Sequence, residues 1–195
     1  MRLFIALNFP AKERQRLHRA GKKLRAADLP MKWVDVKSLH LTFKFLEEVR
    51  PERAEDVKAA INRIAAKTPV LEVTLAGCGA FPTLRRPRVV WVGAEATPEL
   101  RCLKHDLEWE LAPLGFEREV RAFHPHVTLG RADKDARAGD FRAFEDLASE
   151  FDYEAKITVR NVDLMISHLS SKGARYERLL SASLMTPGKV KKAAS

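Results

Sequence analysis

The sequence contains only two cysteines among 195 residues, Cys78 and Cys102. They do not form a Cys-x-x-Cys pair, and two cysteines supply neither a disulfide framework nor a zinc site, so we expect two buried free thiols in a reducing compartment. No apolar run reaches the roughly 18 residues of a transmembrane helix, and the apolar stretch at the N-terminus is too short for a signal peptide. These absences predict a soluble, cytoplasmic protein that does not contact a membrane.

Acidic residues are also in the minority, because 26 Asp and Glu face 35 Lys and Arg, for a formal net charge of +9. Such an excess favours anionic partners, among them nucleic acids and nucleotides. Hydrophobic residues make up 46% and charged residues 31% of the chain, a balance that excludes a disordered or fibrous protein. The length suits one full-sized domain or two small lobes that share a core.

Apolar periodicity predicts helices mixed with runs of adjacent strands, which favours an α+β fold with antiparallel sheets over a doubly wound parallel sheet. We expect a single bilobal domain over residues 1–185 and a basic, disordered tail over 186–195. A stretch with Gly77, Gly79, Pro82 and Pro87 is interpreted as rich in turns. The expected strands cover residues 3–9, 31–36, 39–45, 70–76, 89–92, 124–129, 153–169 and 176–185. Four helices are expected. The first contains Leu17 to Leu24, and the second begins at Pro51. The third begins after the N-cap Thr97 and ends at Gly115, and the fourth follows the cap Asp140.

Two four-residue motifs carry the chemistry: His40-Leu41-Thr42-Phe43 and His126-Val127-Thr128-Leu129. Side chains alternate along a strand, so each motif presents a histidine and a threonine on one face and apolar residues on the other. By the same alternation, Lys44 joins the polar face of the first strand and Phe45 its apolar face. Each motif alone is too short to be informative, but two on predicted strands favour two polar faces that oppose each other across one cleft.

A pair of histidines suits phosphoryl transfer by general acid–base catalysis. One imidazole takes a proton from the attacking oxygen, and the other gives a proton to the departing oxygen on the opposite side of the phosphorus. The threonine hydroxyls can donate hydrogen bonds to the non-bridging oxygens. Metal ligation by His40, His124 and His126 is the less favoured interpretation, since neither motif contains an acidic residue. We therefore expect no metal and no cofactor, and a structural role for His124.

The two motifs stand among further segments that resemble bacterial and archaeal RNA 2',3'-cyclic phosphodiesterases, also called 2'-5' RNA ligases, of the two-histidine phosphoesterase superfamily. The resemblance runs from Met1 to about Leu184. It implies a bilobal α+β fold with two antiparallel sheets facing across a central cleft and helices on the outside. Glu47 stands where this family often has glycine. The segments that carry the resemblance are Met1 to Phe9, Lys44-Phe45-Leu46, Gly79-Ala80-Phe81-Pro82, Arg86-Pro87-Arg88-Val89, Phe123-His124-Pro125-His126 and Gly173-Ala174-Arg175-Tyr176-Glu177.

The resemblance implies hydrolysis of an RNA 2',3'-cyclic phosphate end to a 2'-phosphate, with 2'-5' ligation as the reverse reaction. His40 then matches the proton donor to the 3' oxygen, and His126 matches the base that activates water. Thr42 and Thr128 match the hydroxyls that contact the phosphate. The residues alone do not say which histidine is the acid. RNA with a cyclic phosphate end is the expected partner, and the chain is expected to be a monomer without an obligate protein partner.

Other basic and aromatic residues are less decisive. Arg131, two residues beyond the second motif, is a candidate for holding the phosphate, with surface solvation as an equal alternative. A solvated turn is favoured over RNA contact for Arg85, Arg86 and Arg88, and packing is favoured for Trp109. Two alternatives remain for the whole chain: a noncatalytic RNA-binding module, and a phosphodiesterase for small cyclic nucleotides.

Overall fold

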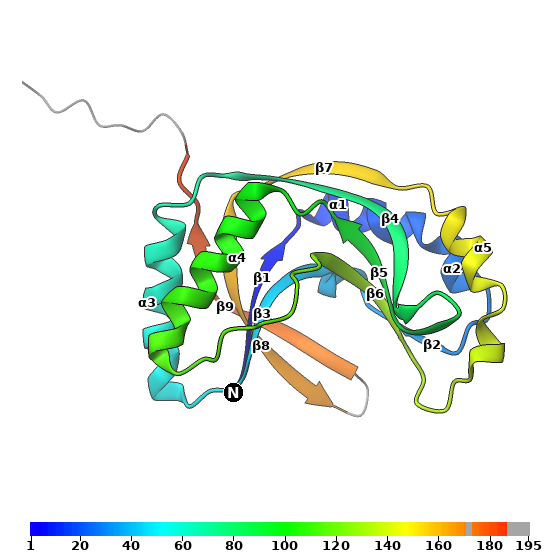
Figure 1. Cartoon of the computed structure of the whole chain (residues 1–195), viewed down its shortest axis with the longest axis horizontal. Helices are drawn as coiled ribbons and strands as arrows, with labels where there is room; N and C mark the ends of the chain where they lie inside the picture. The colour runs from blue at the N-terminus through cyan, green and yellow to red at the C-terminus, as the bar shows by residue number, and fades with distance from the viewer. Residues whose placement is uncertain (171–172, 187–195) are drawn as a thin grey trace, which may run out of the picture.

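The computed structural model describes residues 1–170 and 173–186 (Figure 1). Within these ranges the chain forms five α-helices, three 3-10 helices and nine strands, which confirms the α+β class. The strands are β1 (Arg2–Asn8), β2 (Met31–Trp33), β3 (His40–Glu48), β4 (Leu71–Thr83), β5 (Arg86–Ala94), β6 (His126–Ala132), β7 (Glu154–Val159), β8 (Asn161–Ser170) and β9 (Gly173–Ser183). The helices are α1 (Ala11–Ala20), α2 (Lys22–Ala26), η1 (Val36–Ser38), α3 (Pro51–Ala65), α4 (Pro98–Leu111), η2 (Ala112–Leu114), η3 (Ala138–Phe141) and α5 (Phe144–Ser149).

The strands form one sheet in the order β7-β4-β5-β6-β3-β1-β8-β9, with β2 also paired to β6. Every pairing between these strands is antiparallel, as expected. We call β3, β1, β8 and β9 the His40 lobe, and β7, β4, β5, β6 and β2 the His126 lobe. The two lobes meet at β3 and β6 through a single residue pair, Leu41 with Val127. The two expected sheets are thus joined at one point, where two fully buried apolar side chains meet before the strands diverge.

In Figure 1, α3 and α4 lie at one end of the molecule beside the His40 lobe, and α2 and α5 lie at the other end beside the His126 lobe. Helices α3 and α4 pack against each other, and α3 also contacts β8 and β9 of the His40 lobe. Helix α5 contacts β4 and α2 at the His126 lobe. The expected cap of α4 is confirmed, because Thr97 Oγ1 accepts a hydrogen bond from Leu100 N at 3.3 Å. The core side of α4 is a stripe of buried leucines at helical spacing: Leu100, Leu103, Leu107 and Leu111.

The stretch interpreted as turn-rich is a pair of long strands instead. Strand β4 continues to Thr83 and β5 begins at Arg86, so the connection is only two residues long. Gly79 lies opposite Trp91 in this pair, and a Cβ atom at Gly79 would come within 2.2 Å of the indole ring. The glycine is required there by a cross-strand contact and not by a turn, a distinction that composition alone cannot make.

Three smaller expectations were also wrong. Asp140 does not cap α5, whose N-cap is Ala143; its carboxylate accepts a hydrogen bond from Arg137 N at 2.8 Å and so caps η3. Trp109 is exposed, with the Arg118 guanidinium 4.1 Å from its ring centre, because it lies off the leucine stripe of α4. Both thiols are free as expected, but Cys102 is exposed on the same helix. Burial raises the pKa of Cys78 to about 12.

None of the helices in the described part of the chain combines the length and the apolar character that a membrane span requires. Apart from Thr186, the expected basic tail lies outside the described residues.

Candidate active site

The pair that joins the two lobes also arranges the two motifs. Leu41 and Val127 are each the second residue of their motif, and they are partners in an antiparallel pairing. An antiparallel pair is locally two-fold symmetric, so the residues on either side of this point are related by the same rotation. His40 and Thr42 on β3 therefore occupy positions equivalent to His126 and Thr128 on β6. The two histidines come to one site from positions 86 residues apart in the chain.

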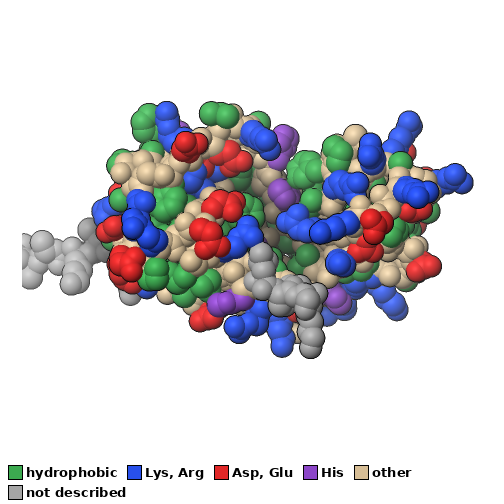
Figure 2. All heavy atoms as spheres, turned by 90° about the horizontal axis from the view of Figure 1, so that it is seen from below, with side chains coloured by type: hydrophobic (Ala, Val, Ile, Leu, Met, Phe, Trp, Pro, Cys, Tyr) green, Lys and Arg blue, Asp and Glu red, His purple; other side chains and the backbone are tan. Residues whose placement is uncertain are grey.

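Alternation along both strands turns the histidines and threonines away from the core. Leu41 and Val127 are fully buried, whereas His40, Thr42, His126 and Thr128 are half-buried on the opposite face. These four side chains and that of Arg131 line one pocket between the lobes, with a volume of about 970 Å³. We call it the central pocket. On the face shown in Figure 2, Lys and Arg side chains border the hollow between the lobes, and histidine side chains are visible there.

The alternation predicted for β3 fails after Phe43. Ala6 on β1 pairs with Thr42 and Ile5 pairs with Lys44, so Phe43 is an extra residue in a β-bulge. The bulge reverses the next two side chains: Lys44 is buried, and Phe45 is 60% exposed at the edge of the central pocket. A second irregularity precedes Glu47, whose φ of +53° lies in the left-handed region that favours glycine. Glu47, which departs from the glycine that the family often has, therefore adopts a backbone conformation that glycine takes more easily.

Each histidine is held through the same ring atom. His40 Nδ1 lies 2.7 Å from the carbonyl oxygen of Ser38, and His126 Nδ1 lies 2.7 Å from that of His124. A carbonyl oxygen only accepts hydrogen bonds, so Nδ1 carries the proton in both rings and donates it. Nε2 of each neutral ring is then the atom with a lone pair. The part of His124 that holds the neighbouring histidine is its backbone carbonyl oxygen, which accepts the hydrogen bond from His126 Nδ1.

Aromatic rings contact both imidazoles from the sides. The His40 ring centre lies 5.0 Å from that of Phe4 and 5.1 Å from that of Tyr176, with Tyr176 edge-on. The His126 ring centre lies 5.2 Å from that of Phe81, also edge-on. These side chains restrict the orientation of each imidazole and shield it from water. Their roles were not predicted from the sequence, although all three lie in segments that carry the family resemblance.

The surroundings make both histidines less basic. Burial lowers the pKa of His40 to about 4, with smaller contributions from the positive charges of Arg131 and His126, while the Ser38 carbonyl opposes the shift. Burial also lowers the pKa of His126, and the positive charges of Arg131 and His124 lower it further. The hydrogen bond to the His124 carbonyl oxygen opposes this shift. The positive charge of Arg131, which also lines the central pocket, lowers the pKa of both rings.

Lys44 is engaged in a buried ion network and not in the open part of the pocket. Its ammonium donates to Glu108 Oε2 at 2.5 Å and to the carbonyl oxygen of Glu117 at 2.7 Å. Lys104 donates to the same carboxylate and to the carbonyl oxygen of Phe43. Burial by itself raises the pKa of Glu108, but the hydrogen bonds from the two lysines lower it below its usual value. The network ties β3, which carries His40, to α4 and to the segment that leads to His126.

The basic turn between β4 and β5 lies away from this pocket. Arg85 pairs with Glu145 at 3.6 Å, and Arg88 donates to the carbonyl oxygen of Asp133 at 3.3 Å. Both partners are groups of the protein surface, and Arg85, Arg86 and Arg88 do not line the central pocket. Within residues 1–170 and 173–186, no three His, Cys, Asp or Glu side chains are grouped so that they could hold a metal ion.

Comparison with known proteins shows the family to which the chain belongs. A family model described as the 2'-5' RNA ligase superfamily matches residues 13–170, more than half of the chain. The chain belongs to this superfamily. A relative from Aeropyrum pernix named RNA 2',3'-cyclic phosphodiesterase is 34% identical over 178 residues, which cover 90% of this chain and 98% of that protein.

Solved structures of the superfamily share the fold. TT0787 of Thermus thermophilus has a TM-score of 0.79 and 30% identity, over 94% of this chain and 98% of that one. Escherichia coli LigT complexed with 3'-AMP has a TM-score of 0.71 and 28% identity, over 94% of this chain and 97% of that one. The bilobal two-histidine phosphoesterase fold implied by the resemblance is therefore confirmed.

Proposed function

We propose that this protein hydrolyses RNA 2',3'-cyclic phosphate ends to 2'-phosphates. The observation that carries the proposal is the two-fold arrangement of His40 and His126 around one pocket, each with Nδ1 held by a carbonyl and Nε2 left as the reactive atom. Acid–base catalysis at phosphorus needs a proton acceptor and a proton donor on opposite sides of the phosphate. The name of the Aeropyrum pernix relative supports the same reaction.

In the forward reaction, His126 Nε2 accepts a proton from a water molecule as its oxygen forms a bond to phosphorus. The bond from phosphorus to the 3' oxygen breaks, and His40 Nε2 gives its proton to that oxygen. The product is a 2'-phosphate beside a free 3'-hydroxyl, and solvent returns the two histidines to their starting states. This assignment of acid and base follows the family resemblance.

The lowered pKa of His40 adds a condition to this mechanism. With a pKa of about 4 the ring is neutral at pH 7 in the free protein, so the donor must gain its proton when substrate binds. An anionic phosphate next to the imidazole favours the charged form and raises its pKa. Thr42, Thr128 and Arg131 supply hydrogen-bond donors for the non-bridging oxygens, where negative charge grows in the transition state.

The deciding experiment is turnover of a short oligoribonucleotide that ends in a 2',3'-cyclic phosphate, with EDTA present. Both His40→Ala and His126→Ala are expected to lose on the order of 10²–10⁴-fold in kcat/KM. His105→Ala, which changes an exposed histidine on α4, is the matched control and is expected to keep full activity. Full activity in either motif variant excludes that histidine from the mechanism, and binding of RNA without turnover by the unaltered protein favours a noncatalytic RNA-binding module.

The same pocket supports the 2'-5' ligation named by the superfamily. If the 5'-hydroxyl of a second RNA strand takes the place of water, attack on the cyclic phosphate forms a 2'-5' linkage. No additional residue is required, because the same two proton transfers occur. Incubation with a 5'-hydroxyl strand in excess tests this step through the appearance of a joined product.

A further inference from the structure

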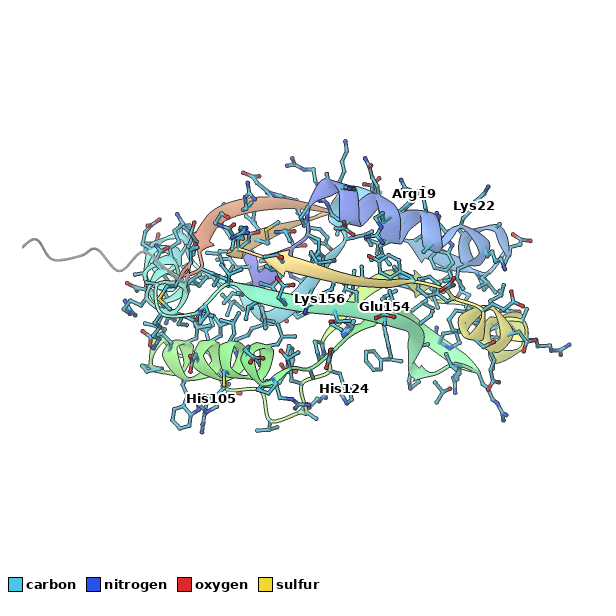
Figure 3. All side chains as sticks on the ribbon, turned by 90° about the horizontal axis from the view of Figure 1, so that it is seen from above. Arg19, Lys22, His105, His124, Glu154 and Lys156 are labelled. Carbon is cyan, nitrogen blue, oxygen red and sulfur yellow. The ribbon has the colours of Figure 1, made fainter. Side chains whose placement is uncertain are left out.

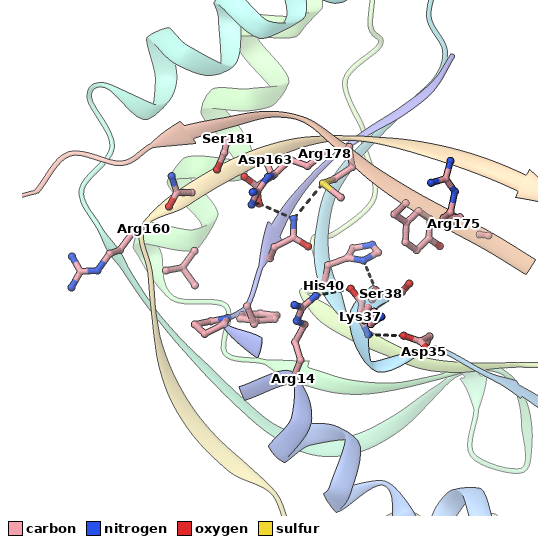
Figure 4. Close-up of a pocket in the computed structure, with 18 of the residues that line it drawn as sticks. Arg14, Asp35, Lys37, Ser38, His40, Arg160, Asp163, Arg175, Arg178 and Ser181 are labelled. Carbon is pink, nitrogen blue, oxygen red and sulfur yellow. Dashed lines mark hydrogen bonds and ion pairs between the residues drawn. The ribbon is translucent and has the colours of Figure 1, made fainter. Parts of the chain in front are cut away.

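A second cavity, of about 840 Å³, opens beside the central pocket (Figure 4). Four residues line both spaces: Ser38, His40, Ala174 and Tyr176. The two cavities are therefore neighbours, and His40 lies in the wall of both. Its volume lies in the range of pockets that hold small organic ligands. Thr42, His126, Thr128 and Arg131 do not belong to its wall, so the proposed reaction does not account for this cavity.

This second cavity is lined by five cationic side chains, and we call it the basic pocket. They come from separate parts of the chain and surround the space in Figure 4: Arg14 on α1, Lys37 on η1, Arg160 after β7, and Arg175 and Arg178 on β9. Within the described residues, Arg178 is the only one of the five with a carboxylate in ion-pair distance. Separate elements that converge on one space with unpaired positive charge form a site for an anion.

The two acidic residues in the wall do not cancel this charge at the surface. Asp35 Oδ1 accepts a hydrogen bond from the backbone N–H of Lys37 at 2.8 Å. Asp163 is 2% exposed, and its Oδ2 accepts from the Asn8 amide at 2.7 Å and lies 4.0 Å from Arg178 Nη1. Both carboxylates therefore interact with protein groups, and a ligand in the pocket meets mainly cations.

Two atoms of the wall have unused hydrogen-bonding capacity. Arg14 Nε and Asp163 Oδ1 are buried and have no hydrogen-bond partner among the described residues. Buried polar atoms in folded proteins almost always have a partner. Both atoms belong to side chains that line the basic pocket; Arg14 Nε can only donate a hydrogen bond, and the Asp163 carboxylate can only accept one.

We propose that the basic pocket holds the RNA strand next to its reacting end, with the phosphodiester that precedes the terminal nucleotide against Arg175 and Arg178. The inference rests on the proposed function, and it names the substrate class: an oligoribonucleotide, not a mononucleoside cyclic phosphate. Because the basic pocket adjoins the central pocket at His40, one strand reaches both. The terminal cyclic phosphate lies between the histidines, and the preceding phosphate lies among the arginines.

The test compares kcat/KM for a trinucleotide that ends in a 2',3'-cyclic phosphate with kcat/KM for a mononucleoside 2',3'-cyclic phosphate. Arg175→Gln/Arg178→Gln removes two charges from the basic pocket while leaving the central pocket intact. The matched control is Arg19→Gln/Lys22→Gln, which removes two exposed charges from the outer side of the α1–α2 region (Figure 3). Because Arg178 approaches a buried carboxylate, single Arg175→Gln and Arg160→Gln proteins are assayed too, each with its thermal unfolding midpoint.

We expect the double basic-pocket variant to lose about 10-fold or more on the trinucleotide and less than about twofold on the mononucleotide. Its rate on the trinucleotide also becomes less sensitive to salt, with the log–log slope reduced by about 0.7 per lost phosphate contact. Equal losses on both substrates, or no loss on the trinucleotide in any of the three variants, overturn the inference while the proposed function stands. No turnover of either substrate by the unaltered protein overturns the proposed function, and the inference with it.

Discussion

Replacement of His40 by asparagine tests whether the fold holds this ring in its neutral form. The folded pKa is about 4, against 6.5 for an unperturbed histidine. Above pH 6.5 the ring is neutral in both states and adds nothing to the pH dependence of stability. Between pH 6.5 and pH 4 the unfolded chain takes up a proton that the folded chain does not, so the free energy of unfolding falls as the pH is lowered.

The size of this loss follows from the two pKa values. Between pH 7 and pH 4.5, a group with pKa 6.5 unfolded and about 4 folded lowers the free energy of unfolding by about 2 kcal/mol. His40→Asn removes the titrating group, and its side-chain amide can still donate to the Ser38 carbonyl. Between pH 7 and pH 4.5, the free energy of unfolding of the variant is therefore expected to fall by about 2 kcal/mol less than that of the unaltered protein.

The assay is urea denaturation at both pH values, with stability extrapolated to zero denaturant and equal m-values required. His105→Asn serves as the control for a histidine at the surface, and its pH dependence is expected to match that of the unaltered protein. If His40→Asn and the unaltered protein lose the same free energy between pH 7 and pH 4.5, then His40 is not kept neutral by burial, and the pKa argument for the mechanism fails.

Three further predictions follow from the packing and the charges. The pH profile of kcat/KM is expected to be bell-shaped, with its maximum below pH 6.5. The maximum lies midway between two apparent pKa values, and the pKa values of both histidines are lowered. A maximum above neutral pH contradicts these lowered pKa values. Gly79→Ala lowers the free energy of unfolding by about 1–3 kcal/mol, because the added methyl group collides with the Trp91 ring, and denaturant titration measures it. Glu108→Gln lowers the free energy of unfolding by about 3–5 kcal/mol, since it removes the one carboxylate that the described residues place in ion-pair distance of buried Lys44. Glu110→Gln on the same helix breaks only an exposed ion pair with Arg63, so it changes the free energy of unfolding by less than about 1 kcal/mol. Similar losses of stability in the two variants would show that the buried network contributes no more than an exposed ion pair.

The parts of the fold that the sequence predicted well are those in which local chemistry decides the structure. Helix α4 follows from Thr97, Pro98 and its leucines, which act within one segment of chain. The long hairpin of β4 and β5 was missed because Gly79 and Trp91 are neighbours only after the strands pair. In the absence of that partner, a glycine inside a strand and a glycine in a turn have the same sequence signal.

The candidate site shows the same division. Strand alternation was sufficient to place His40 and Thr42 on one face, since it depends only on the backbone geometry of a strand. The prediction failed at Lys44 because a bulge depends on how β1 pairs with β3. Likewise, nothing in the composition indicates that Phe4 and Tyr176 contact His40, because they come from strands at opposite ends of the chain.

The rotational relation between the two motifs has a consequence for how a substrate is oriented. A site whose four central side chains are interchangeable by a half-turn cannot by itself distinguish the two ends of a strand. Direction has to come from residues that lack a symmetric equivalent. Arg131 is one such residue. It lies five residues after His126, and the position five residues after His40, on β3, is occupied by Phe45. Under the proposed function, a cation at one of these positions and an aromatic ring at the other give the cleft a phosphate side and a base side, and so give the bound chain a polarity.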